Sequence, residues 1–174
     1  MKLFVTVGAE KRPFNRLIKI VDQYVAAGIF PKKTFIQTGH SFYRPKHCSS
    51  CSFLNYNDME NKVADADTVI SHAGMGTVIL CLRHHKIPIL FPRMFSYREH
   101  VDDHQLIFAH TMAEKGLALT AQTPEELQKI FLNYTKLSKC MNPKQRRYHK
   151  NELLAYLKKT LDLFSKKGIK THGY

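Results

Sequence analysis

Short apolar runs alternate along this chain with longer segments of helical periodicity. The runs are rich in β-branched and aromatic residues and have the length of strands; they cover 2–7, 34–38, 68–70, 87–91 and 117–120. The segment 14–27 instead places apolar residues on one helical face and ends at Gly28. Alternation of this kind is typical of a parallel sheet covered by helices. We therefore predict an α/β fold with a Rossmann-like, mostly parallel sheet flanked by helices.

In the rest of the chain, polar residues that favour helix N-caps indicate where further helices begin. A very short strand is expected at 53–54, just before one of these caps. The expected helices start near position 57 with Asn57 or Asp58 as cap, cover 104–115 with Asp102 or Asp103 as cap, and run from Pro124 to about 137 with Thr123 as cap.

The turn between the strand at 68–70 and the helical segment at 78–82 contains two glycines, Gly74 and Gly76. A backbone without side chains can approach a ligand closely, and the free N–H groups of a helix start favour an anion such as a diphosphate. A glycine turn of this kind is a structural necessity about as often as a phosphate cradle. The third glycine of a dinucleotide-binding fingerprint is absent, which argues against a nicotinamide-dependent dehydrogenase.

The length of the chain and the distribution of its charges indicate how many domains it forms. With 174 residues, 44% of them hydrophobic, the chain can bury one core. The formal net charge is +13, and residues 136–170 hold eleven basic against two acidic side chains. We predict a core domain over 1–142 and a basic C-terminal helix and tail over 143–174. No apolar run reaches the roughly 18 residues of a membrane span, and the N-terminus does not resemble a signal peptide, so we expect a cytoplasmic protein.

Four cysteines stand at positions 48, 51, 81 and 140, and the first two form a CxxC pair. A structural zinc site usually needs a second such pair, and only His40 and His47 lie nearby to complete one. Reduced thiols are the expected state in the cytoplasm, and no metal site is predicted.

Several motifs occur in a specific order: Phe4 to Gly8, 13–18, 35–39, 53–59, Ile70 to Thr77, 91–93 and 99–105. Over residues 1 to about 120 this pattern resembles the donor-binding C-terminal domain of family 28 glycosyltransferases. That family includes MurG and the catalytic subunit of the dolichol-linked GlcNAc transferase. The pattern is most similar to short bacterial capsule and exopolysaccharide subunits of the β-1,4-galactosyltransferase type. The resemblance implies the C-terminal half of the two-domain GT-B architecture.

The resemblance also implies roles for individual residues. Those expected beside the donor diphosphate are Gly8, Ala9, His72, Ala73, Gly74, Met75, Gly76, Thr77 and Arg93. Leu54, Tyr56 and Met59 would line a uracil pocket, with plain core packing as an equal alternative. Asp103 and Gln105 would bind the hydroxyls of the donor sugar, although Asp103 could also serve only as a helix cap. Leu80 stands where many members of the family carry a glutamate that holds the ribose.

The candidate general bases on this chain are His72, His100 and Glu99, because they stand near the expected site. In MurG-like enzymes the base belongs to the acceptor half, and His72 has an alternative role as a structural or phosphate-contacting residue. No DxD motif stands among the expected site residues, so no cofactor or metal is expected, and a UDP-sugar is the expected donor substrate.

The resulting hypothesis is a catalytic subunit that transfers a hexose from a UDP-sugar to a lipid-linked oligosaccharide in capsule or exopolysaccharide synthesis. A membrane-associated acceptor-binding subunit would supply the missing half and hold the chain at the inner face of the membrane. The basic tail could dock on that partner or on an anionic membrane surface, and a homodimer is an alternative. Two other hypotheses remain open: a non-catalytic scaffold or nucleotide-binding subunit of the same fold, and a nucleic-acid-binding protein suggested by charge alone, for which no motif is present.

Overall fold

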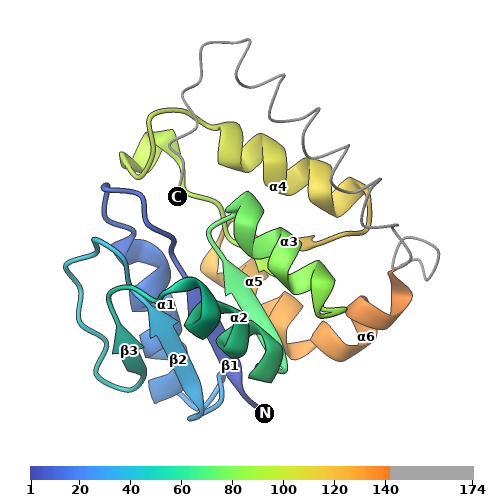
Figure 1. The fold of residues 1–174 in the computed structure, drawn as a ribbon, viewed down its shortest axis with the longest axis horizontal. Coiled ribbons are helices and arrows are strands. Elements are labelled where there is room, and N and C mark those ends of the chain that lie inside the picture. The colour runs from blue at the N-terminus through green and yellow to red at the C-terminus, as the bar shows by residue number, and fades with distance from the viewer. Residues whose placement is uncertain (142–174) are drawn as a thin grey trace.

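The computed structural model describes residues 1–141, which form a six-stranded sheet with the strand order β3-β2-β1-β4-β5-β6 (Figure 1). All five strand pairs are parallel. The strands are β1 Leu3–Thr6, β2 Thr34–Gln37, β3 Ser49–Cys51, β4 Thr68–Ser71, β5 Ile89–Leu90 and β6 Leu119–Thr120. Successive strands are added outward from β1 to β3 on one side of the sheet and from β4 to β6 on the other. Ligands of such sheets bind at the carboxyl ends of the strands at this switch point between β1 and β4. The predicted basic helix over 143–174 lies outside the described residues.

Helices cover both faces of the sheet, as a parallel sheet requires. They are α1 Asn15–Ala26, α2 Tyr56–Asp65, α3 Met75–Arg83, α4 His104–Glu114, α5 Pro124–Leu132 and α6 Tyr134–Cys140, with a 3-10 turn η1 at Phe95–Tyr97. One core cluster joins α1 and α5 to the sheet, and another joins α2 and α3 to its opposite face. A third cluster packs α4 against α3. No helix in the described part of the chain has the length and apolar character needed to cross a bilayer.

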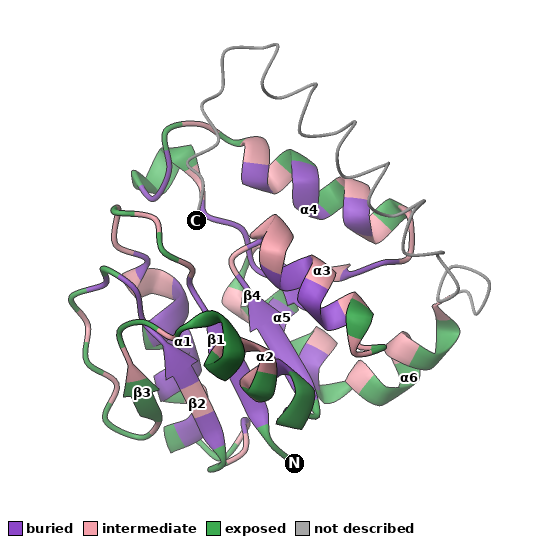
Figure 2. Ribbon diagram, viewed as in Figure 1, coloured by how far each residue is buried: buried purple, intermediate pink, exposed green. Residues whose placement is uncertain are grey.

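The alternation of side chains in β1 explains why both faces are covered. Leu3 and Val5 belong to the α1–α5 core, whereas Phe4 belongs to the α2–α3 core. All of them are almost fully buried, as Figure 2 shows in purple for β1 and β4. Burial of one such side chain stabilises the fold by about 1.5–3 kcal/mol. A strand without a polar face is therefore placed at the centre of the sheet.

The prediction of a strand at 53–54 is wrong, because the third strand is formed by Ser49–Cys51. Its backbone pairs with β2 in register, Ile36 opposite Ser50, and none of its side chains is buried. A serine-rich edge strand carries no hydrophobic signal, so only backbone pairing reveals it. Phe53 is instead half exposed, and Asn55 is the N-cap of α2.

The helix caps differ in detail from the expected ones. The Asn55 side chain accepts the Asp58 N–H at 2.9 Å, so neither Asn57 nor Asp58 caps α2. At α4 the N-cap position belongs to Asp103, but Asp102 Oδ1 accepts the His104 N–H at 3.2 Å. The Thr123 cap of α5 is confirmed, with its hydroxyl accepting the Glu126 N–H. The single helix predicted from Pro124 to 137 is interrupted at Asn133, which lies between the end of α5 at Leu132 and the start of α6 at Tyr134.

Candidate functional site

Two turns meet at the carboxyl ends of β1 and β4. Thr6 and Ser71 are paired at the ends of these neighbouring strands. The first turn passes through Gly8 with φ of +75°, and the second passes through Ala73 with φ of +64° and leads into α3. Left-handed backbone is cheap for glycine and costs about 1 kcal/mol for alanine, so the second turn is held by its surroundings. Both predicted loops therefore lie at the switch point of the sheet.

The His72 imidazole fills the space between these turns. Its Nδ1 lies 3.3 Å from the Thr6 carbonyl oxygen, which can only accept, so we assign the proton to Nδ1 and the lone pair to Nε2. A Cβ at Gly8 would lie 2.3 Å from His72 Nε2, and one at Gly74 would lie 2.4 Å from it. Both glycines are therefore required by a neighbouring side chain, independently of any ligand.

The electrostatic environment keeps His72 neutral. Burial, together with the charges of Arg93 and His100, lowers the pKa of His72 to about 3, although the hydrogen bond to the Thr6 carbonyl oxygen raises it. A base with so low a pKa is a poor proton acceptor at neutral pH. We therefore assign His72 the structural role that the sequence left open, in place of general base.

Arg93 lies directly beneath the turns and is fully buried. Its guanidinium donates to the carbonyl oxygens of Val7 at 2.8 Å, Arg12 at 2.7 Å and Glu99 at 3.1 Å. Burial lowers the pKa of Arg93 to about 10, so the group stays charged at neutral pH. The cation thus ties the Gly8 loop to the connection after β5, and only its Nε lacks a partner among the described residues. A direct contact between Arg93 and a phosphate stays a prediction.

Glu99 forms a two-pronged ion pair with Arg16 of α1. Arg16 Nε donates to Glu99 Oε1 at 3.0 Å and Arg16 Nη2 donates to Oε2 at 2.8 Å, while the Met94 N–H also donates to Oε2. Arg16 further donates to the carbonyl oxygen of Pro92. Both carboxylate oxygens accept hydrogen bonds and the side chain is buried. We therefore assign Glu99 the role of holding the loop between β5 and α4 against α1, in place of the predicted role of general base.

His100 lies in a cluster that the sequence analysis did not assemble. Its Nδ1 is 3.2 Å from Asp102 Oδ1, and His104 Nδ1 contacts the same oxygen. The two imidazole rings meet edge to face with centroids 4.5 Å apart. Burial and the nearby His104 lower the pKa of His100. Alternation of His, Asp and His at positions 100, 102 and 104 was the available sequence signal.

Residues expected to bind the donor sugar lie at the start of α4. Gln105 is nearly buried, and its Oε1 accepts the Arg93 N–H at 3.3 Å. Asp103 is exposed, and its Oδ1 accepts the Phe95 N–H at 2.9 Å. Each side chain therefore accepts a backbone hydrogen bond from the loop between β5 and α4. Their contacts with a sugar stay predictions.

The start of α3 provides the expected anion-binding geometry. The helix begins at Met75 after Gly74, and its first turn contains no acidic side chain. The first N–H groups of any helix lack intrahelical partners and carry the positive end of the helix dipole. Met75 and Gly76 are partly exposed, whereas Thr77 is buried. The N–H groups of this turn are available to an anion at the switch point.

The predicted uracil-pocket residues divide into two groups. Leu54 and Met59 pack against the cluster of Phe4 and its neighbours, which supports core packing as their role. Tyr56 is largely exposed and its hydroxyl accepts a hydrogen bond from Arg83 at 2.6 Å. Leu80 belongs to the same core cluster, so the position of the absent glutamate is filled by an apolar core side chain.

The cysteine pair forms no disulfide, and all four thiols of the chain are free. Burial and the adjacent carboxylate of Asp22 raise the pKa of Cys48 to about 12, so its thiol is protonated at neutral pH. Protonated thiols are poor nucleophiles and metal ligands.

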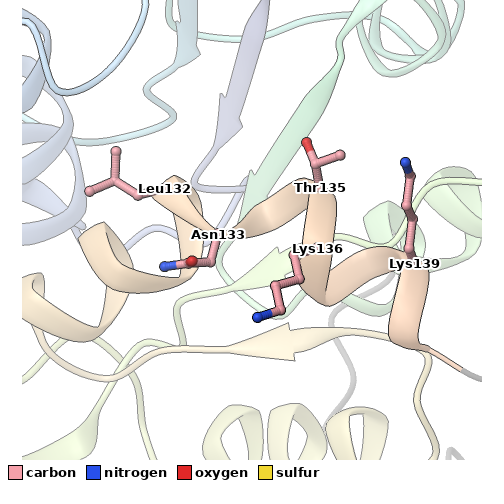
Figure 3. Close-up of a pocket in the computed structure, with 5 residues that line it drawn as sticks. All are labelled: Leu132, Asn133, Thr135, Lys136 and Lys139. Atoms are coloured by element: carbon pink, nitrogen blue, oxygen red, sulfur yellow. The ribbon is translucent and has the colours of Figure 1, made fainter.

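A hollow of about 460 Å³ lies beside α5 and α6, away from these turns (Figure 3). It is lined by Leu132, Asn133, Thr135, Lys136 and Lys139. Tyr134 at the start of α6 donates to the carbonyl oxygen of Ile87, which precedes β5. The hollow therefore lies near the amino edge of the sheet, whereas the polar groups described above converge at the carboxyl edge. We place the functional site at the carboxyl edge.

The sheet order and the switch-point turns define a Rossmann-like α/β domain whose candidate binding site lies at the carboxyl edge of β1 and β4. The sequence profile of the glycosyltransferase family 28 C-terminal domain matches residues 2–161, and the chain belongs to this family. The match confirms the family that the sequence motifs indicated.

Comparison with individual proteins agrees with this assignment. The chain is 35% identical over 75 residues to the UDP-N-acetylglucosamine transferase subunit ALG13 of Cryptococcus neoformans, a match that covers 42% of this chain and 36% of that relative. The fold is similar to MurG of Acinetobacter baumannii, with a TM-score of 0.55 and 22% identity over 95% of this chain and 50% of MurG. It is also similar to the glycosyltransferase of kitacinnamycin, with a TM-score of 0.62 and 16% identity over 95% of this chain and 43% of that one.

The solved relatives are GT-B glycosyltransferases, which confirms the predicted fold class. The chain spans about half the length of these structures and about a third of the fungal relative.

Proposed function

We propose that this chain is the donor-binding, catalytic half of a two-component glycosyltransferase. Its substrate would be a UDP-hexose, and its acceptor a hydroxyl of a lipid-linked saccharide in capsule or exopolysaccharide synthesis. The observation that carries this proposal is the meeting of the Gly8 loop with the start of α3 at the switch point, above the buried cation of Arg93. Membership of a glycosyltransferase family makes a sugar nucleotide the natural anion for this site.

The arrangement suits the chemistry of glycosyl transfer. The acceptor oxygen forms a bond to the anomeric carbon, the bond from that carbon to the β-phosphate oxygen breaks, and UDP leaves with the electron pair. The N–H groups of the first turn of α3 would stabilise the charge that grows on the leaving diphosphate. The buried guanidinium of Arg93 would add a fixed positive potential from below the turns.

The proton of the acceptor hydroxyl needs a base, and we place that base on a partner. His72 is neutral with a pKa of about 3, and both oxygens of Glu99 are engaged by Arg16 and the Met94 N–H. His100 is the remaining candidate on this chain, and its contact with Asp102 orients its ring.

A partner is supported by the fungal relative, which is named as a subunit of a UDP-N-acetylglucosamine transferase. We propose a membrane-associated subunit that binds the acceptor and closes the site, with the chain in the cytoplasm at the inner face of the membrane. The net charge of +13 favours docking on that partner or on anionic head groups. A homodimer that closes the site is the alternative assembly.

The second candidate is a nucleotide-binding or scaffold subunit without catalysis of its own. The apolar, buried Leu80 at the place of the ribose-binding glutamate favours it. Transfer activity of the reconstituted pair, lost when this chain alone carries a site substitution, would decide for catalysis.

Titration of the purified chain with UDP, UDP-glucose, UDP-galactose and UDP-GlcNAc tests the proposal. Gly76→Asp and Gly76→Asn form a matched pair, since both add a side chain of the same size at the first turn of α3 and only one adds a negative charge. Aspartate there favours the helix itself, so folding is preserved. We expect UDP binding to be at least about 10-fold weaker for the aspartate variant than for the asparagine variant. Equal binding by the pair, or no nucleotide binding by the folded wild type, would overturn the donor-site assignment.

A further inference from the structure

We propose that His100, Asp102 and His104 bind a divalent transition-metal ion of the zinc type. Among the described residues these three form the cluster of potential ligands, and one ligand atom from each lies within 4.8 Å of the others. They occupy alternate positions of one segment that follows η1 and ends in the first residue of α4. The proposal goes beyond the donor-binding function and departs from the expectation that the protein needs no metal.

The ligand atoms converge on one point. Asp102 Oδ1 is approached by His100 Nδ1 at 3.2 Å, by His104 Nδ1, and by the backbone N–H of His104 at 3.2 Å. In a tetrahedral site with bonds of about 2.0–2.1 Å, neighbouring ligand atoms are about 3.3 Å apart. The spacing of His100 and Asp102 therefore already matches that of two ligands of one ion. The edge-to-face contact of the two rings lets both Nδ1 atoms face the same carboxylate.

The surrounding structure holds the ligands in place. His100 is 7% exposed, and the carbonyl oxygen of its neighbour Glu99 accepts a hydrogen bond from the buried Arg93. His104 is the first residue of α4, so a regular element fixes its backbone. Little conformational entropy remains to be lost on binding, which favours affinity. The negative charge of Glu10 also acts on His100, which adds to the attraction for a cation.

The donor set indicates which ion fits. Two imidazole nitrogens and one carboxylate oxygen suit Zn²⁺, Co²⁺ or Mn²⁺ better than Mg²⁺ or Ca²⁺, which prefer oxygen ligands. Three protein ligands leave at least one coordination position open to water or to an oxygen of a small ligand. A bound ion would also explain why two histidines face one carboxylate oxygen in a partly buried place.

The experiment uses the full chain without a histidine tag, stripped with a chelator and titrated with Co²⁺ while its visible absorption is recorded. We expect one equivalent to bind, with d–d bands and no thiolate charge-transfer band, and Zn²⁺ to displace it. His100→Gln, Asp102→Asn and His104→Gln should each weaken binding at least about 10-fold, because each removes a direct ligand. Asp102→Asn keeps an acceptor for the His104 N–H, so α4 retains its cap.

Two controls separate this site from adventitious binding. His110→Gln removes an exposed histidine of α4, and Cys48→Ser with Cys51→Ser removes the CxxC thiol pair; both should leave Co²⁺ binding unchanged. Zn²⁺ should raise the melting temperature of the wild type and of these controls, but not of the ligand variants. Absence of stoichiometric binding by the folded chain, binding unaffected by the ligand substitutions, or equal loss in His110→Gln would each overturn the proposal.

Discussion

The imidazole of His72 occupies the space that a side chain at position 74 would need, since a Cβ on Gly74 would lie 2.4 Å from His72 Nε2. The three nearest atoms to that Cβ all belong to His72, and Gly74 itself has an ordinary φ of −76°. Glycine at this position is thus explained by one neighbour. The contact provides a test of the site that requires no ligand.

We expect Gly74→Ala to lower the free energy of unfolding by about 1–3 kcal/mol, the usual cost of overpacking. The same substitution in a His72→Ala background should cost much less, because the clashing ring is gone. Urea unfolding of the two single variants and the double variant measures this coupling. Strictly additive losses would show that the ring is not the cause.

Gly8→Ala should behave differently from Gly74→Ala. A Cβ at Gly8 also meets His72, but the backbone there is left-handed, with φ of +75°. Removal of the ring should therefore restore only part of the loss, and about 1–2 kcal/mol should persist as backbone strain. The same unfolding measurements, made on Gly8→Ala with and without His72→Ala, check this. Complete rescue would contradict the strained turn.

The buried ion pair of Arg16 and Glu99 should matter for stability. Glu99→Gln leaves the guanidinium of Arg16, which is 19% exposed, without its anion, and we expect a loss of about 3 kcal/mol. Arg16→Met in the same chain should recover part of that loss, because no unpaired charge remains. The exposed pair of Lys2 and Asp65 is the control, and Asp65→Asn should change the unfolding midpoint little. An equally small effect of Glu99→Gln would refute the fastening role.

Acid should destabilise the protein through His72. Its pKa is about 3 in the folded state, mainly because of burial, against an ordinary value of 6.5. Between these values the unfolded chain binds a proton that the folded chain does not, so stability falls as the pH drops through this window. Between about pH 7 and about pH 5 the wild type should lose up to roughly 2 kcal/mol more than His72→Asn. Parallel losses in the two proteins would show that His72 does not titrate as described.

Gln105 should affect the sugar more than the nucleotide. If its amide contacts the hydroxyls of the donor, Gln105→Ala should weaken the binding of one UDP-sugar by about 10-fold, which corresponds to the loss of one or two hydrogen bonds. The affinity for UDP should not change. Gln105→Glu retains the Oε1 that accepts the Arg93 N–H and separates loss of that support from loss of the sugar contact. Calorimetric titration of each variant with UDP and the three UDP-sugars measures these affinities. Equal weakening of UDP itself would mean that the residue only supports the turn.

Strand pairing shows where hydrophobic pattern suffices and where it does not. The apolar runs at β1, β4 and β5 are buried on both faces and were predictable from sequence. The serine-rich β3 was not, because its place in the sheet depends on backbone hydrogen bonds to β2 and not on burial. The break at Asn133 between α5 and α6 was also missed, because the helical periodicity continues across it.

By itself the sequence determined the α/β class, the glycine turn that opens α3 and the family, because apolar periodicity, turn residues and motif order are local properties of the chain. Only the tertiary structure decided what the polar residues do. Arg93 meets the carbonyl oxygen of Val7 across 86 positions, and Arg16 meets Glu99 across 83. These contacts show that Arg93 and Glu99 hold the loops of the site together, while a contact of Arg93 with a phosphate stays a prediction. The convergence of His100 and His104 on Asp102 likewise depends on side-chain directions that sequence spacing does not specify.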